Sequence, residues 1–185
     1  MKKACVLIAE GFEEVEALTP VDYLRRAGVE VTLFGLGGRS VRGARGITVV
    51  ADAVLEDASV DVGFDAVVVP GGMPGAKNLA ESRAAREFIV RHFEGGKLVA
   101  AICAAPAVVL HEGCGILKGR RFTGYPGTER QVTGAVFTSG RVVVDGNLIT
   151  SRGAGTAGEF AIAIIEALMG ENAARTVADC VLLKR

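Results

Sequence analysis

Short, wholly apolar runs alternate along the chain with longer segments whose apolar residues recur at helical spacing. The runs show no polar alternation, so they predict strands that are buried on both faces. After residue 13, Ala17, Val21 and Leu24 recur at i, i+4 and i+7, which places them on one face of a helix. The predicted strands are 4–9, 29–34, 47–50, 66–69, 98–102, 141–144 and 148–150, and the predicted helices are 13–27, 82–93, 104–111, 156–169 and 171–179.

Buried strands that alternate with helices are typical of a mostly parallel sheet covered by helices on both faces. Asp145-Gly146-Asn147 joins the last two predicted strands and predicts a hairpin turn. No repeat, low-complexity tract or linker divides the sequence, so we expect a single domain, 1–185. In such a sheet ligands bind at the carboxyl ends of the strands, and the residues that follow each strand are therefore the functional candidates.

Charge and hydropathy exclude several classes of protein. The chain has 21 Lys and Arg residues against 21 Asp and Glu residues, whereas binding to nucleic acid or a membrane surface needs a basic excess. The longest stretch without charge or glycine, 98–110, is shorter than the ~20 residues of a membrane span. The apolar run 4–9 is also too short for a signal peptide. We expect a cytoplasmic protein that binds neither nucleic acid nor membranes.

Cys103 follows the predicted strand 98–102 and precedes a predicted helix. A thiol at such a turn lies beside unpaired helical N–H groups and the positive end of the helix dipole, so we expect its pKa below the ordinary ~8.5. Cys5 lies inside a strand and is expected in the core, while Cys114 and Cys180 fall in loop or terminal segments. No C-x-x-C spacing is present, so neither a metal site nor a disulfide framework is expected.

Only two histidines are available as a base for this thiol. His111 lies ~12 Å further along the same predicted helix, and His92 lies toward the opposite edge of the sheet. A cysteine protease or amidase, which normally pairs Cys with His, is therefore disfavoured. The remaining proton carrier is a glutamate in the segment Glu-Gly-Phe-Glu-Glu-Val-Glu, 10–16, although acidic residues are also frequent at helix starts. A carboxyl group beside the thiol would share one proton with it, held on the glutamate.

Two glycine-rich segments also follow predicted strands. The adjacent Gly71 and Gly72 allow close backbone approach, which suits an oxyanion site or, equally, an ordinary tight turn. Segment 151–158 matches G-x-G-x-x-G, but too little chain follows it for a dinucleotide-binding unit. We expect its glycines to let a helix pack closely on the sheet, and we expect no cofactor.

Together these segments resemble the ThiJ/PfpI superfamily, in its DJ-one/ThiJ branch, over essentially the whole chain. The matching motifs are Glu10-Gly11-Phe12-Glu13-Glu14-Val15-Glu16, Pro20-Val21-Asp22, Leu24-Arg25-Arg26-Ala27-Gly28, Val69-Pro70-Gly71-Gly72, Ala101-Ile102-Cys103-Ala104 and Thr150-Ser151-Arg152-Gly153-Ala154-Gly155-Thr156.

The resemblance implies a flavodoxin-like three-layer α/β/α sandwich with a mostly parallel sheet, similar to class I glutamine amidotransferases, and a homodimer. It assigns Cys103 as an elbow nucleophile and Glu16 as the carboxyl group that hydrogen-bonds to it. The implied backbone donors are Gly72 and Ala104, the pocket candidates are Gly71, Tyr125, Arg45 and Arg152, and the arginines near the dimer interface and pocket rim are Arg25, Arg26 and Arg45.

Members of this superfamily are described as cofactor-free glyoxalases (glyoxalase III), deglycases, oxidative-stress sensors and chaperones. Some carry a histidine where this chain has Tyr125, and the peptidase branch carries one where it has Ala104. We therefore expect a cysteine-dependent, metal-free glyoxalase or deglycase that acts on methylglyoxal-type dicarbonyls or early glycation adducts. The alternative is a redox-sensing, stress-protective chaperone that uses oxidation of Cys103; a protease or amidase is the less favoured reading.

Overall fold

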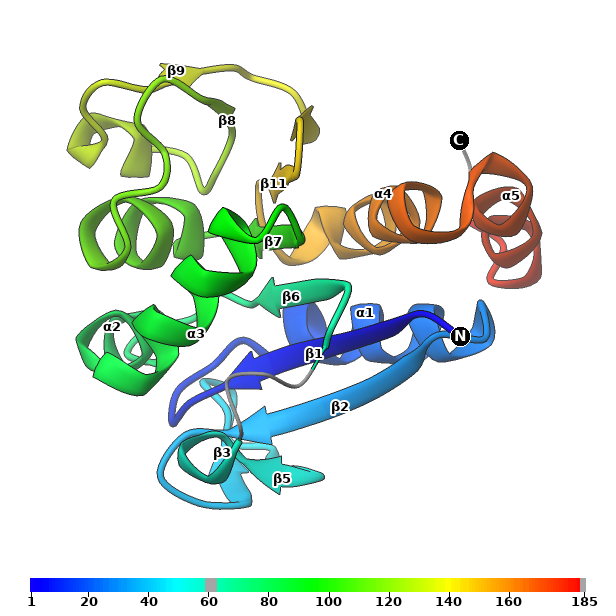
Figure 1. The fold of residues 1–185 in the computed structure, drawn as a ribbon, viewed down its shortest axis with the longest axis horizontal. Coiled ribbons are helices and arrows are strands. Elements are labelled where there is room, and N and C mark those ends of the chain that lie inside the picture. Colours follow the sequence, from blue (N-terminus) through cyan, green and yellow to red (C-terminus); the bar gives the residue numbers. More distant parts are fainter. Residues whose placement is uncertain (59–62, 184–185) are drawn as a thin grey trace.

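The computed structural model describes residues 1–58 and 63–183 and shows a central sheet with helices on both faces (Figure 1). The sheet order is β10-β11-β7-β6-β1-β2-β5. All neighbouring strands are parallel except β10 and β11, which form an antiparallel hairpin at one edge. The strands are β1 (Lys3–Ile8), β2 (Glu30–Gly35), β5 (Ala53–Val54), β6 (Ala66–Val69), β7 (Leu98–Ile102), β10 (Val142–Asp145) and β11 (Leu148–Ser151).

The core has two halves, one on each face of the sheet. Along β1, Ala4, Val6 and Ile8 face one half, while Cys5 and Leu7 face the other, and all five side chains are fully buried. The first half is covered by α1 (Glu14–Arg26), α4 (Ala157–Met169) and α5 (Glu171–Cys180). The second is covered by α2 (Gly75–Glu81), α3 (Arg83–Glu94) and a π-helix, Pro106–Gly113. The predicted three-layer sandwich is confirmed.

Several short elements differ from the sequence prediction. The predicted strand 47–50 is β4 (Thr48–Val50), which pairs with β3 (Ser40–Arg42) in a separate hairpin rather than in the main sheet. The pattern also gave no sign of α2 or of the short pair β8 (Arg121–Phe122) and β9 (Val136–Phe137). Strands β8 and β9 have only two residues each, which is too short to show a period in the apolar pattern.

The helix after β7 begins later than predicted. Residues 103 and 104 form the turn, Ala105 is the N-cap, and the helix starts at Pro106, a residue that is well tolerated in a first helical turn. Cys180 is the last residue of α5 rather than part of a loop. Gly158 was expected to bring α4 close to the sheet; instead, a Cβ there would lie 3.0 Å from Leu183 Cδ1, so this glycine serves the contact between α4 and the C-terminal segment.

Candidate functional site

Cys103 occupies a sharp elbow at the carboxyl end of β7. Its φ angle is +66°, in the left-handed region that side chains other than glycine rarely adopt. Two backbone hydrogen bonds hold this conformation: the Cys103 N–H donates to Ser151 O at 3.0 Å, and the Tyr125 N–H donates to Cys103 O at 2.8 Å. Strain of this kind persists only where the surroundings impose it and is concentrated at functional sites.

Glu16 reaches the same point from the first turn of α1. Glu13 caps this helix by accepting the Glu16 N–H at 2.9 Å, and the Glu16 side chain turns inward with only 1% of the residue exposed. Its carboxylate accepts the Gly71 N–H at 2.9 Å and interacts with the Ala154 N–H and the Cys103 thiol. Of the glutamates in segment 10–16, Glu16 is therefore the one placed against the cysteine.

The sheet order explains why these side chains meet. Strands β7, β6 and β1 are neighbours, so the segments that follow them emerge at one edge. Gly71, which follows the middle strand, lies between the other two: a Cβ there would be 2.6 Å from Cys103 Cβ and 2.8 Å from Glu16 Oε2. Only glycine leaves room for this approach. Gly72, with φ of +84°, then turns the chain away.

The Cys103–Glu16 pair shares its protons. Burial raises the pKa of Glu16 from 4.5 to about 7, although hydrogen bonds from Cys103, Gly71 and Ala154 oppose the rise. Burial, together with the Glu16 carboxylate, raises the pKa of Cys103 to about 12. Between these values the pair as a whole holds one proton and one negative charge. Because Glu16 has the lower pKa, the proton lies mainly on the sulfur and not, as expected, on the glutamate.

The expectation of a thiol pKa below the ordinary value is therefore wrong for Cys103 beside an ionised Glu16. The N–H groups of Ala104 and Gly72 do act on the sulfur and lower its pKa, but burial and the neighbouring carboxylate outweigh them. Cys5 is sealed in the core as expected, and burial alone raises its pKa further.

Of the other predicted site residues, Tyr125 and Arg152 lie near the Cys103–Glu16 pair and Arg45 lies in a separate hairpin. Tyr125 and Arg152 line a cavity of about 400 Å³ beside it, and Gly153 separates the cavity from Glu16. Arg45 lies instead in the turn of the β3–β4 hairpin, where its backbone N–H donates to Glu14. Sequence reasoning missed Ala154 and Ser151, because their part is played by backbone groups that any residue would supply.

The two histidines are structural, as expected. His92 is buried beside Phe88, with Nδ1 2.7 Å from the Phe88 carbonyl oxygen, and His111 Nε2 lies 3.3 Å from the Thr133 N–H. Within residues 1–58 and 63–183, no three His, Cys, Asp or Glu side chains are grouped as metal ligands.

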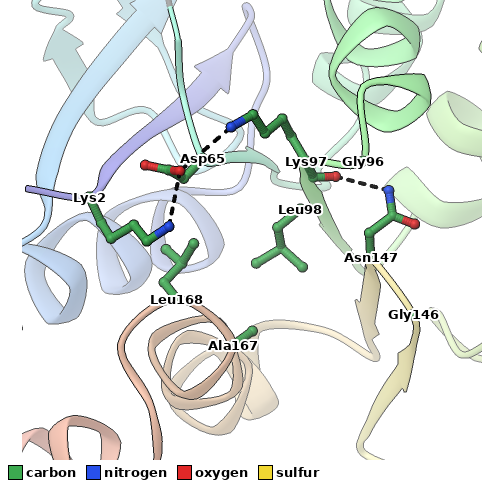
Figure 2. A pocket seen from close by; sticks show the side chains of 9 residues that line it. All are labelled: Lys2, Asp65, Gly96, Lys97, Leu98, Gly146, Asn147, Ala167 and Leu168. Atoms are coloured by element: carbon green, nitrogen blue, oxygen red, sulfur yellow. Dashed lines mark hydrogen bonds and ion pairs between the residues drawn. The ribbon is translucent and has the colours of Figure 1, made fainter.

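A second cavity, of about 350 Å³, lies at the opposite edge of the sheet (Figure 2). Asp65 accepts the Lys3 N–H at 3.0 Å and pairs with Lys2 Nζ at 3.2 Å and with Lys97 Nζ at 3.7 Å. These contacts, chiefly the Lys3 N–H, lower the pKa of Asp65. The cavity adjoins the amino ends of β1, β6 and β7, whereas Cys103 follows the carboxyl end of β7, so the two sites are separate.

Comparison with known families shows the family to which the chain belongs. The model of the DJ-1/PfpI family matches residues 2–167. The chain belongs to the DJ-1/PfpI family. A Parkinson disease protein 7 homolog from Danio rerio is 43% identical over 99% of this chain and 98% of its own length. The glutathione-independent glyoxalase DJR-1.2 of Caenorhabditis elegans is 36% identical over 91% of this chain and 90% of its own.

Solved structures give the same answer for the fold of this DJ-1/PfpI protein. Oxidised Toxoplasma gondii DJ-1 superposes with a TM-score of 0.96 at 38% identity and full coverage of both chains. The predicted family and its flavodoxin-like fold are confirmed. Of the helices that the structure describes, none is both long and apolar enough to cross a bilayer.

Proposed function

We propose that this protein is a cysteine-dependent, glutathione-independent glyoxalase that converts methylglyoxal-type dicarbonyls into hydroxy acids, with early glycation adducts as related substrates. The observation that carries the proposal is the pair of Cys103 and Glu16. In this pair a nucleophile and a proton carrier lie together at the carboxyl edge of the sheet. The similarity to a relative named as a glutathione-independent glyoxalase supports it.

In the first step the Cys103 sulfur attacks the aldehyde carbon of methylglyoxal. The thiol proton passes to the Glu16 carboxylate, whose pKa of about 7 suits a general base at neutral pH. Charge that develops on the aldehyde oxygen is stabilised by the N–H groups of Gly72 and Ala104, which already face the sulfur. Glu16 then gives this proton to the aldehyde oxygen, which yields a neutral hemithioacetal and restores the Glu16 carboxylate.

Glu16 then moves a proton between the two substrate carbons. It removes the proton from the former aldehyde carbon and, through an enediol, returns one to the neighbouring carbon, which leaves a thioester on Cys103. Water hydrolyses the thioester to lactate and restores the thiol. The net reaction adds one water to methylglyoxal, so it needs no external oxidant, reductant, metal or glutathione.

Lactate formation from methylglyoxal tests this mechanism. Cys103→Ser should abolish turnover, and Glu16→Gln should lower kcat by about 10²-fold or more, because the proton relay is lost. Cys180→Ser, which changes an exposed thiol on α5, is the matched control and should keep the wild-type rate. Wild-type turnover by Cys103→Ser would remove the proposal.

A second function at the same residue is redox sensing with a stress-protective, chaperone-like role. The observation that favours it is the close match to a DJ-1 structure described as oxidised. Two equivalents of peroxide would convert the Cys103 thiol to a sulfinic acid with release of two waters, and a protonated Glu16 would donate a hydrogen bond to it. A mass gain of about 32 Da confined to Cys103, with negligible methylglyoxal turnover, would favour this function over the first.

We also propose a homodimer. Val15 on α1 and Ile47 and Val50 on the β3–β4 hairpin are 49%, 55% and 68% exposed, and a cavity of about 360 Å³ lies between α1 and Ile47. Val15 and Ile47 line this cavity together, and exposed apolar groups brought together from two elements favour a protein contact. The implied occupant is a second copy of this chain, as the resemblance suggests.

A further inference from the structure

We propose that Arg152 adapts this site to substrates that carry a carboxylate or phosphate group, so that anionic aldehydes are preferred over neutral ones of similar size. The proposal deepens the proposed function, and it rests on that function only in taking Cys103 as the reacting group. It assigns Arg152 a role in specificity that is separate from the chemistry of the Cys103–Glu16 pair.

The location of Arg152 is fixed by its two neighbours in the chain. The carbonyl of Ser151 accepts the Cys103 N–H at 3.0 Å, and a Cβ on Gly153 would lie 3.9 Å from Glu16 Oε1. Arg152 thus stands between two residues that contact the reactive pair. Arg152 lines the cavity of about 400 Å³ together with Tyr125.

The charge of Arg152 is not neutralised by a carboxylate. Arg141, the other arginine of this cavity, pairs with Glu159 at 2.7 Å and donates to Gly155 O at 2.8 Å. Arg152 has a 3.5 Å contact with the carbonyl of Ser139, and no carboxylate oxygen of residues 1–58 or 63–183 lies within 4.0 Å of it. The amino end of α4, which begins at Ala157, adds further positive potential beside the cavity.

An anionic substrate needs such a cation here. Near neutral pH the Cys103–Glu16 pair carries a negative charge, and Glu13 adds another carboxylate close to Glu16. These charges repel an incoming anion, whereas a neutral dicarbonyl meets no such barrier. A guanidinium group in the adjoining cavity offsets the repulsion and can bind a carboxylate or phosphate through two hydrogen bonds.

Gly153 lies between the cavity and the Cys103–Glu16 pair. A Cβ at this position would lie 3.6 Å from the Tyr125 ring and 3.9 Å from Glu16 Oε1, so a methyl group would occupy that space in ordinary van der Waals contact. The φ angle of Gly153 is 164°, which is extended backbone that any residue adopts. The glycine is therefore not required by the backbone conformation, and its lack of a side chain leaves the space between the Tyr125 ring and Glu16 unfilled.

Alkylation of Cys103 by a matched pair of reagents tests the proposal without depending on glyoxalase turnover. Iodoacetate and iodoacetamide have nearly the same shape, and only the first is charged. The rate constant for each at Cys103 is measured by mass spectrometry of the folded protein. In Arg152→Gln the ratio of the iodoacetate to the iodoacetamide rate should fall about threefold or more, because the anion loses its counter-charge.

Two further variants make the result specific. Arg152→Lys keeps the charge and should retain most of the wild-type ratio, while Arg91→Gln removes a positive charge from α3 and should leave the ratio unchanged. If both rates are unchanged in Arg152→Gln, Arg152 does not act on either reagent, and the proposal is overturned. If both rates fall equally, Arg152 acts on the sulfur and not on the charge of the reagent, which also overturns the proposal. A wild-type protein that does not convert methylglyoxal would contradict the proposed glyoxalase function, but it would not contradict this role of Arg152.

Discussion

Glu16 shows how one buried residue sets the working pH of the site. An ordinary glutamate is fully ionised at pH 7, but burial raises the pKa of Glu16 to about 7. Below this pH both groups of the pair are protonated and the sulfur has no proton acceptor. Above it the pair carries a negative charge, and the sulfur can lose its proton to Glu16 as a bond forms. Reactivity should therefore rise with pH through about 7.

A pH profile of Cys103 alkylation by iodoacetamide checks this assignment. The wild-type rate should rise through an apparent pKa of about 7, which belongs to the pair rather than to either group. Glu16→Gln should abolish that step and leave the rate low at pH 7, since the amide accepts no proton. Asp179→Asn on α5 is a control that removes a carboxylate elsewhere and should keep the wild-type profile. A profile unchanged by Glu16→Gln would contradict the coupling.

At the scale of elements, the sequence predicted those strands and turns that have a regular apolar pattern or a characteristic turn sequence. Strand β1 was predictable because its side chains are apolar on both faces, and the edge hairpin because Asp145-Gly146-Asn147 marks its turn. Cys103 was predictable as a site because it follows a buried strand. The apolar pattern alone did not reveal that β7, β6 and β1 lie side by side, and this neighbourhood selects Glu16.

Glu14 shows what the sequence alone could not predict about the site. Like Glu16 it belongs to α1 and is buried, with 3% exposed, yet it serves the β3–β4 hairpin. Its Oε1 accepts the N–H groups of Arg45 at 2.8 Å and Ile47 at 3.3 Å, and a Cβ on Gly43 would collide with the carboxylate. The sequence shows several acids at one helix start, but only the hairpin packed on α1 separates a structural carboxylate from a reactive one.

Glu14→Ala should destabilise the protein by about 1–3 kcal/mol, because the N–H donors of Arg45 and Ile47 lose their acceptor. Urea unfolding measures the loss, and hydrogen exchange should show faster exchange of these two amides while β1 keeps its protection. Glu10→Ala, at an exposed position in the preceding loop, should change stability little. Equal stability of the two variants would show that the hairpin holds without Glu14.

At the scale of the whole molecule, the same hairpin would connect the site to the proposed dimer. The hairpin packs on α1, and α1 supplies Glu16. A partner bound to Val15, Ile47 and Val50 would therefore contact the helix that positions Glu16. Burial of apolar side chains is worth about 25 cal/mol per Å², so burying Val15 and Ile47 between two copies of the chain would favour the proposed dimer.

Ile47→Asp tests the homodimer directly. In a symmetric dimer each interface contains the substituted residue twice, so two carboxylates would be buried without partners. The dimer dissociation constant measured by sedimentation should rise by about 10²-fold or more, whereas Val136→Asp, at a 56% exposed position on β9, should leave it unchanged. A wild-type chain that sediments as a monomer at micromolar concentration would contradict the assembly. If Ile47→Asp instead yields a monomer whose Cys103 keeps its reactivity toward iodoacetamide, the site is complete within one chain, and dimerisation contributes stability rather than catalytic groups.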